Sequence, residues 1–86
     1  MSTAEKLKKR VAKIPRDFTY VEAKSLLKTL GFEEYNKGRT SGSRVRFFRE
    51  SDGAVVDLHK PHPEKEMKKY AVEQLVEKLR EYGELE

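Results

Sequence analysis

The stretch that decides the fold reads SRVRFFRESDGAVVDL and covers residues 43–58. Charged and apolar side chains alternate over residues 44–47, and every even-numbered residue of 54–58 is apolar, a period typical of half-buried strands. Residues 50–53, ESDG, have the composition of a turn. The stretch therefore predicts two antiparallel strands joined by a short turn, with one face of the pair directed toward a core.

The apolar faces of the two strands also fix their register, because a slip of one residue would turn every side chain to the other face. The predicted cross-strand pairs toward the core are Phe47–Val56 and Val45–Leu58, and those on the outer face are Arg44–His59, Arg46–Asp57 and Phe48–Val55.

The segments on either side of this hairpin add a third strand and two helices. Thr19 and Glu22 have the spacing of a capping box, so a helix is expected over residues 20–30, with Gly31 as its left-handed stop. Residues 32–37 are expected to form a strand. A last helix follows Pro63 and ends before Gly83, with its core side formed by Val72, Leu75, Val76 and Leu79. The sequence thus predicts an α+β domain of order αβββα, with a three-stranded antiparallel sheet whose second face is free.

A short amphipathic helix is expected before this domain. Its apolar stripe is narrow and consists of Ala4, Leu7, Val11 and Ile14. Ser2 and Glu5 are spaced as a second capping box, and Pro15 ends the helix at or before Ile14. We expect residues 1–16 to be an N-terminal extension that docks on the body of the domain, which comprises residues 17–86.

The length of the chain, its lack of cysteine and the distribution of its charges limit the classes of protein to which it can belong. The chain of 86 residues is the size of a single domain, has no cysteine and contains no apolar run near the roughly 20 residues of a membrane span. Residues 1–50 contain 13 Lys and Arg against 6 Asp and Glu, whereas residues 51–86 contain 6 against 9. The lack of cysteine and of a membrane span favours a cytoplasmic protein. The charge asymmetry favours a basic surface for nucleic acid, although lysines that only maintain solubility would give a similar composition.

The basic residues gather in a Gly/Ser-rich loop and the strand that follows it. We expect RNA phosphates to contact this segment through Lys37, Arg39, Ser43, Arg44, Arg46 and Arg49. Arg46 is expected to pair with Asp57 across the hairpin. Arg44 and Arg49 have no obvious acidic neighbour in the sequence and are the better candidates for RNA contact, while Phe48 is placed to stack on a base.

His59 and His62 are the candidates for catalysis, because histidine is the side chain that exchanges protons near neutral pH. A histidine beside a basic strand can remove the proton of a ribose 2′-hydroxyl, which would permit RNA cleavage without a metal. Surface hydrogen bonding is the alternative role for both. A zinc site is not expected, since Pro61 interrupts the His-x-x-His spacing and the usual further ligands are lacking. No cofactor is predicted.

Three stretches carry a resemblance to a known family: residues 26–32 (LLKTLGF), residues 42–44 (GSR) and residues 61–63 (PHP) with the closing helix. Over about residues 18–83 the chain resembles the HicA family of toxin–antitoxin systems. The resemblance implies a double-stranded-RNA-binding-like αβββα sandwich, mRNA endoribonuclease (interferase) activity without a cofactor, and inhibition by a cognate antitoxin protein.

Two positions depart from the pattern of that family. Its Gly-Ser-His motif, whose histidine is taken as catalytic, reads Gly42-Ser43-Arg44 here, and its proline–any–histidine element is altered to Lys60-Pro61-His62. A guanidinium cannot act as a base near neutral pH, because its pKa exceeds about 12. Either His59 or His62 carries out catalysis, or the protein binds RNA without cutting it. A module that only docks a protein partner on its free sheet face is the third hypothesis.

Overall fold

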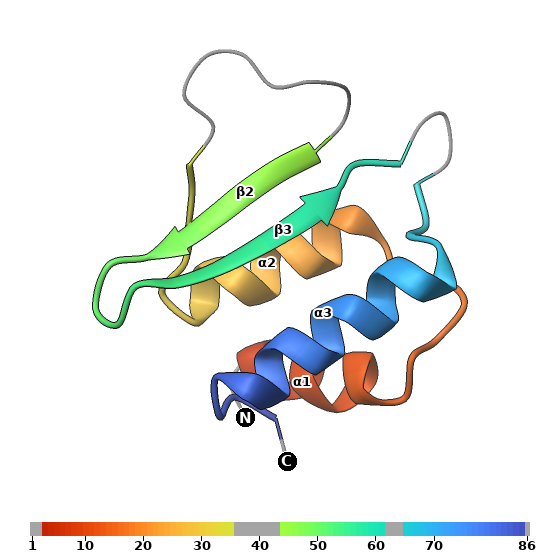
Figure 1. Ribbon diagram of the computed structural model, residues 1–86. Helices are drawn as coiled ribbons and strands as arrows, with labels where there is room; N and C mark the ends of the chain where they lie inside the picture. Colours follow the sequence, from red (N-terminus) through yellow and green to blue (C-terminus); the bar gives the residue numbers. More distant parts are fainter. Residues whose placement is uncertain (1–2, 36–43, 62–64, 86) are drawn as a thin grey trace.

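The computed structural model describes residues 3–35, 44–61 and 65–85, and within these residues the chain forms three helices and one three-stranded antiparallel sheet. The helices are α1 (Thr3–Ala12), α2 (Tyr20–Thr29) and α3 (Lys69–Glu81), and the strands are β1 (Glu33–Glu34), β2 (Arg44–Arg49) and β3 (Ala54–His59). Figure 1 shows α2 and α3 on one side of the sheet, with α1 on the side of these helices away from the strands. The predicted α+β class, with its αβββα order and extra N-terminal helix, is confirmed.

The hairpin has the predicted register. All five predicted cross-strand pairs occur, and Arg49 pairs with Ala54 beside the turn. The side chains of β2 and β3 that face the helices are buried, whereas those on the outer face are exposed or half-buried. The sheet therefore has one face in the core and one face that no helix among the described residues covers.

The core lies between the sheet and the two helices that cover it. Its largest fully buried side chains include Phe18, Phe32 and Phe47, which come from the connection before α2, the segment after α2 and the centre of β2. The helices contribute residues at helical spacing: Ala23, Leu26 and Leu27 from α2, and Ala71, Val72, Leu75, Val76 and Leu79 from α3. All four core residues that the sequence predicts for the last helix are buried.

The ends of α2 and α3 follow the predicted signals. The Glu22 amide donates to the Thr19 hydroxyl at 3.1 Å, and the Thr19 amide donates to the Glu22 carboxylate at 2.9 Å, so the capping box is complete. Gly31 and Gly83 follow the two helices with φ of 96° and 78°. Only glycine adopts this conformation without strain, which explains why each helix ends there.

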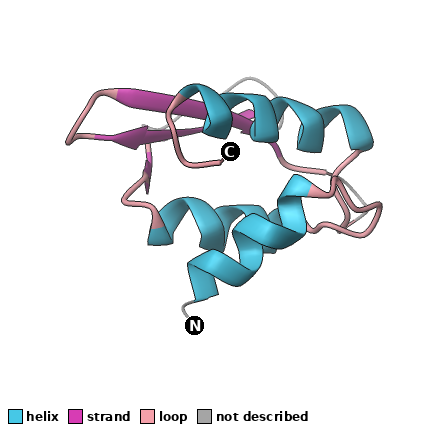
Figure 2. Ribbon diagram, turned by 90° about the horizontal axis from the view of Figure 1, so that it is seen from below, coloured by secondary structure: helices cyan, strands magenta, loops and turns pink. Residues whose placement is uncertain are grey.

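Helix α1 packs against α2, as Figure 2 shows, and it contributes to the core because Val11 is fully buried. The Arg10 guanidinium donates to the Glu22 carboxylate at 2.7 Å and lies 5.7 Å from the centroid of the Phe18 ring, so α1 is tied to the start of α2. The expectation that the helix docks on the body is confirmed. It ends at Ala12, and Ile14 has a φ of 51° before Pro15. Ser2 of the predicted capping box lies outside the described residues.

The described part of the first strand is shorter than predicted. Residues 32–37 were expected to form it, but β1 spans only Glu33–Glu34, and Phe32 packs into the core just before it. Residues 36 and 37 lie outside the described residues. The Tyr35 amide still donates to the Arg46 carbonyl at 2.6 Å, so the pairing of this segment with β2 extends to Tyr35.

No helix within the described ranges has both the length and the apolar character needed to cross a membrane.

Candidate nucleic-acid interface

The open face of the sheet brings together the outward-facing residues of β2 and β3. The alternation of side chains along a strand places every second residue on this face. These residues are Arg44, Arg46, Phe48, Val55, Asp57 and His59. They form three cross-strand pairs in a row, which we call the sheet-face row. A cation and a histidine form one end of the row, an ion pair forms the middle, and apolar side chains form the other end.

Arg44 and His59 face each other at the end of the row away from the β2–β3 turn. Both residues are exposed. Directly opposed residues of antiparallel strands have Cβ atoms about 4.5–5.5 Å apart, so both side chains are able to contact one bound group. Among the described residues, neither side chain has an ion pair or hydrogen bond. Both side chains of this pair are therefore available to a ligand.

Arg46 and Asp57 form the predicted ion pair in the middle of the row. The Arg46 Nε donates to Asp57 Oδ1 at 3.0 Å, and its Nη2 donates to Oδ2 at 3.4 Å. The hydrogen bond from this guanidinium raises the pKa of Arg46, so the side chain stays cationic. About half of the Arg46 side chain remains exposed. The pair therefore contributes little to stability, and its charges largely cancel.

The prediction that Arg49 has no acidic neighbour is wrong. Arg49 is 9% exposed, and its guanidinium donates to both carboxylate oxygens of Asp52, at 2.9 and 2.8 Å. Its Nη1 also donates to Glu84 at 2.8 Å. The physical reason is the alternation of β2, since residue 49 lies on the same face as Val45 and Phe47 and its charge is turned into the protein.

Arg49 instead contacts side chains from three other segments of the chain. We call these residues together the Arg49 cluster: Phe32, Arg49, Asp52 and Glu84. The guanidinium also donates to the Leu30 carbonyl at 3.1 Å, beyond the end of α2, and lies 4.7 Å from the centroid of the Phe32 ring. The hydrogen bonds that the guanidinium donates to Asp52 and Glu84 raise the pKa of Arg49. Arg49 thus has a clear structural role, and the function proposed below depends on Arg44 rather than on Arg49.

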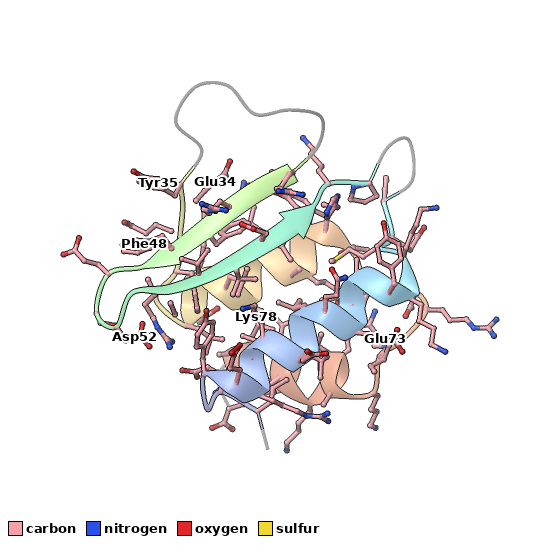
Figure 3. All side chains as sticks on the ribbon, in the orientation of Figure 1. Glu34, Tyr35, Phe48, Asp52, Glu73 and Lys78 are labelled. Atoms are coloured by element: carbon pink, nitrogen blue, oxygen red, sulfur yellow. The ribbon has the colours of Figure 1, made fainter. Side chains whose placement is uncertain are left out.

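Tyr35 is a residue of this face that sequence reasoning missed. Its ring lies 6.0 Å from the Phe48 ring, centroid to centroid, with an angle of 49° between the planes. Figure 3 shows the two labelled rings next to each other beside β2. Because the Tyr35 amide pairs with Arg46, Tyr35 continues the pattern of β1 onto the open face. Side chains alternate between the two faces along residues 33–35, so Glu33 and Tyr35 lie on the same face. The sequence alone does not show that this is the open face, because that depends on the register of β1 against β2.

Tyr82 closes part of the outer edge of the sheet. Its hydroxyl donates to the Val55 carbonyl at 3.0 Å and accepts from the Val55 amide at 3.2 Å. A shallow pocket of about 340 Å³ adjoins this contact, between β3 and the outer side of α3. Its lining includes Asp57, Glu77 and Lys78, so it is polar and of mixed charge.

The remaining sequence-predicted site residues, Lys37, Arg39, Ser43 and His62, lie outside the described residues. Within the described ranges there is no group of three or more His, Cys, Asp or Glu side chains placed to hold a metal ion.

Comparison with known proteins identifies the family. The model of the family described as HicA toxin of bacterial toxin-antitoxin matches residues 21–83, which include nearly all of α2, the whole sheet and α3. Searches of curated proteins and of solved structures gave no match. Because the match covers well over half of the sequence, the chain belongs to the family of HicA toxins of bacterial toxin–antitoxin systems.

Proposed function

We propose that this chain is an RNA-directed toxin, a metal-independent mRNA endoribonuclease that a cognate antitoxin holds inactive. It acts in the cytoplasm, where its RNA substrate is found. Residues 17–86 form the domain that acts on RNA, and residues 1–16 form an extension docked on it. Membership of the HicA toxin family supports this proposal, and the open face of the sheet provides the site.

The observation that carries the proposal is the Arg44–His59 pair. A guanidinium and an imidazole lie directly opposite each other on an exposed face, and neither has a carboxylate partner among the described residues. An arginine recognises phosphate through paired N–H donors, and a neutral imidazole accepts a proton. A phosphodiester over this pair would contact both groups.

The proposed reaction uses the RNA itself as the nucleophile. His59 accepts the proton of a ribose 2′-hydroxyl, and the 2′-oxygen forms a bond to the adjacent phosphorus. The bond from phosphorus to the 5′-oxygen of the next nucleotide breaks, and that oxygen takes up a proton. The products are a 2′,3′-cyclic phosphate and a 5′-hydroxyl. Arg44 stabilises the additional negative charge on the phosphate oxygens during the reaction.

His62 is a second candidate for a proton-transfer role, since it lies three residues after His59. Lys37, Arg39 and Ser43 remain proposed phosphate contacts on sequence grounds, because a stretch rich in Gly and Ser directly precedes Arg44 in the sequence.

A second candidate function is RNA binding without cleavage. It is favoured by Arg44, which stands where the family motif has its histidine, because an arginine at this position binds phosphate but removes no proton. In both candidate functions Arg44 contacts the RNA backbone, and the two are separated by a cleavage assay.

The backbone contact of Arg44 is tested with RNA that carries 2′-O-methyl groups and cannot be cleaved. We expect Arg44→Gln to reduce the slope of log K against log salt concentration by about 0.7, the value for one single-strand phosphate contact. Affinities are measured by fluorescence anisotropy between about 50 and 200 mM salt.

The matched control is Arg16→Gln, which removes the same charge from an exposed arginine in the connection between α1 and α2. The proposal requires the slope of this control to stay at the wild-type value. Equal slopes for the wild type and Arg44→Gln would remove Arg44 from the interface. A wild-type slope near zero would reject the electrostatic binding of RNA altogether.

A further inference from the structure

The aromatic pair formed by Tyr35 and Phe48 lies on the same face of the sheet as the Arg44–His59 pair, but at a different position in the sheet-face row. Phe48 is two positions from Arg46 and four from Arg44 along β2, which corresponds to about 13 Å of strand. Tyr35 comes from the segment after β1 and lies beside Phe48. Phe48 is therefore too far from the Arg44–His59 pair to contact the same phosphate.

This pair has the exposure of a binding site rather than of a core contact. Tyr35 is 52% exposed, Phe48 is half-buried, and Val55 opposite Phe48 is also half-buried. No helix within the described part of the chain covers the two rings. The Tyr35 amide donates a hydrogen bond to the Arg46 carbonyl at 2.6 Å, so the ring is carried by a backbone that is held against β2. A preorganised ring loses little freedom when it binds.

The charges around the rings favour a base over a phosphate at this position. Glu33, which pairs with Phe48 in the register of β1 and β2, is exposed beside the rings and would repel an anion. The charge of Arg46 is balanced by Asp57, and the cation without a carboxylate partner among the described residues, Arg44, lies at the other end of the row. The face is thus graded from an acidic and aromatic end to a basic end, which suits a nucleotide chain whose base lies on the rings and whose backbone passes the arginines.

We infer that Tyr35 and Phe48 form a stacking site for one base of single-stranded RNA, displaced along the strand from the phosphate at Arg44 and His59. The inference rests on the proposed function and adds a place where the RNA is recognised. Aromatic side chains on an open sheet face stack on unpaired bases because every base has a π-face. This contact selects for an unpaired nucleotide at a fixed distance from the bond that is cleaved.

The test uses the full chain and a set of 2′-O-methyl RNA oligonucleotides in which one base at a time is removed. We expect the wild type to lose affinity roughly 5- to 100-fold at one abasic position, which is the usual contribution of one stacked base. Tyr35→Ala is expected to bind the intact oligonucleotide more weakly than the wild type by a similar factor. Removal of the base at that same position should not weaken the binding of Tyr35→Ala any further. Tyr35→Phe, which keeps the ring, is expected to bind like the wild type.

Tyr70→Ala is the matched control, because Tyr70 is 51% exposed in the first turn of α3 and is the same residue type. Its affinity should equal that of the wild type. Phe48→Leu, which retains an apolar half-buried side chain, is a second variant that should reproduce the loss. Thermal unfolding of each variant checks that the fold is intact.

Two outcomes would overturn the stacking site while leaving the proposed function in place: unchanged RNA affinity of Tyr35→Ala and Phe48→Leu, or equal losses at Tyr35 and Tyr70. Unchanged RNA affinity together with weaker binding of the antitoxin would assign the rings to the protein partner and would likewise overturn it. A wild-type chain that binds no RNA would refute both the stacking site and the proposed function.

Discussion

His59→Ala is expected to lower the rate of RNA cleavage by about 10²- to 10⁴-fold, which is the usual contribution of a positioned general base. The loss arises because His59 is the described residue that pairs with Arg44 and offers a proton acceptor on the exposed face. Cleavage is measured on a labelled RNA, and binding is measured in parallel on its 2′-O-methyl form. Binding should change little, since the guanidinium of Arg44, which carries the proposed backbone contact, is retained.

A growth assay extends this prediction to cells. Induced expression of the wild-type chain is expected to arrest bacterial growth, and His59→Ala is expected to relieve the arrest. His62→Ala is the informative comparison, because its side chain is the alternative proton acceptor. If His62→Ala relieved the arrest and His59→Ala did not, the assignment of the base to His59 would be wrong.

Arg44→His offers a sharper control, because it restores the Gly-Ser-His motif of the family at residues 42–44. In the His59→Ala background this change should recover part of the lost cleavage, since it returns a proton acceptor to the opposite side of the same pair. Absence of any recovery would mean that the two positions do not share one phosphate.

The second large effect is expected at Arg49. Arg49→Met should lower the free energy of unfolding by about 2–3 kcal/mol, because it removes the guanidinium donor from Asp52, Glu84 and the Leu30 carbonyl. Asp52 keeps the hydrogen bond from the Ala54 amide, and Glu84 keeps its ion pair with Lys8. The value lies below that of a fully buried pair, since the side chains of Asp52 and Glu84 are 46% and 22% exposed and can bind water instead. The melting temperature should fall by roughly 10–20 °C, and urea unfolding at unchanged slope gives the free energy.

Arg46→Met is the matched control on the same strand. Its ion pair with Asp57 is exposed, so the loss should stay within about 1 kcal/mol. Equal losses at the two positions would contradict the structural role assigned to the Arg49 cluster.

The Arg49 cluster should also make the free energy of unfolding depend on pH in the acidic range. The hydrogen bond from Arg49 holds the pKa of Asp52 below its ordinary value. A carboxyl with a lowered pKa stabilises the fold above its unfolded-state pKa of about 4, and this stability is lost as the pH falls through the lower folded-state pKa. The wild type should therefore lose more stability than Arg49→Met between about pH 5 and pH 2. Parallel losses in the two proteins would show that Asp52 is not coupled to Arg49.

The sequence was sufficient for features that depend on local pattern. The register of β2 and β3 followed from matching Phe47 with Val56, because a slip of one residue would turn the apolar face outward. The ends of α2 followed from Thr19, Glu22 and Gly31, whose roles need only the residues of their own helix.

Features that depend on distant contacts were missed. Arg49 contacts Glu84, which lies 35 residues further along the chain. No local sequence pattern indicates a contact over that separation. The alternation along β2 places Arg49 on the same face as Val45 and Phe47, toward the core. Arg49 was nevertheless assigned to the RNA-binding surface, because that surface was predicted from the number of basic residues in the segment. The aromatic pair was missed for a similar reason, since Tyr35 meets Phe48 only through the pairing of β1 with β2.

The most direct test of the central claim, that the chain is a metal-independent endoribonuclease, is cleavage of a 5′-labelled RNA by the purified protein in excess chelator. The account predicts that the wild type produces fragments ending in a 2′,3′-cyclic phosphate under these conditions and that His59→Ala does not. Intact RNA after incubation with a folded wild-type protein, or cleavage that the chelator abolishes, would contradict it.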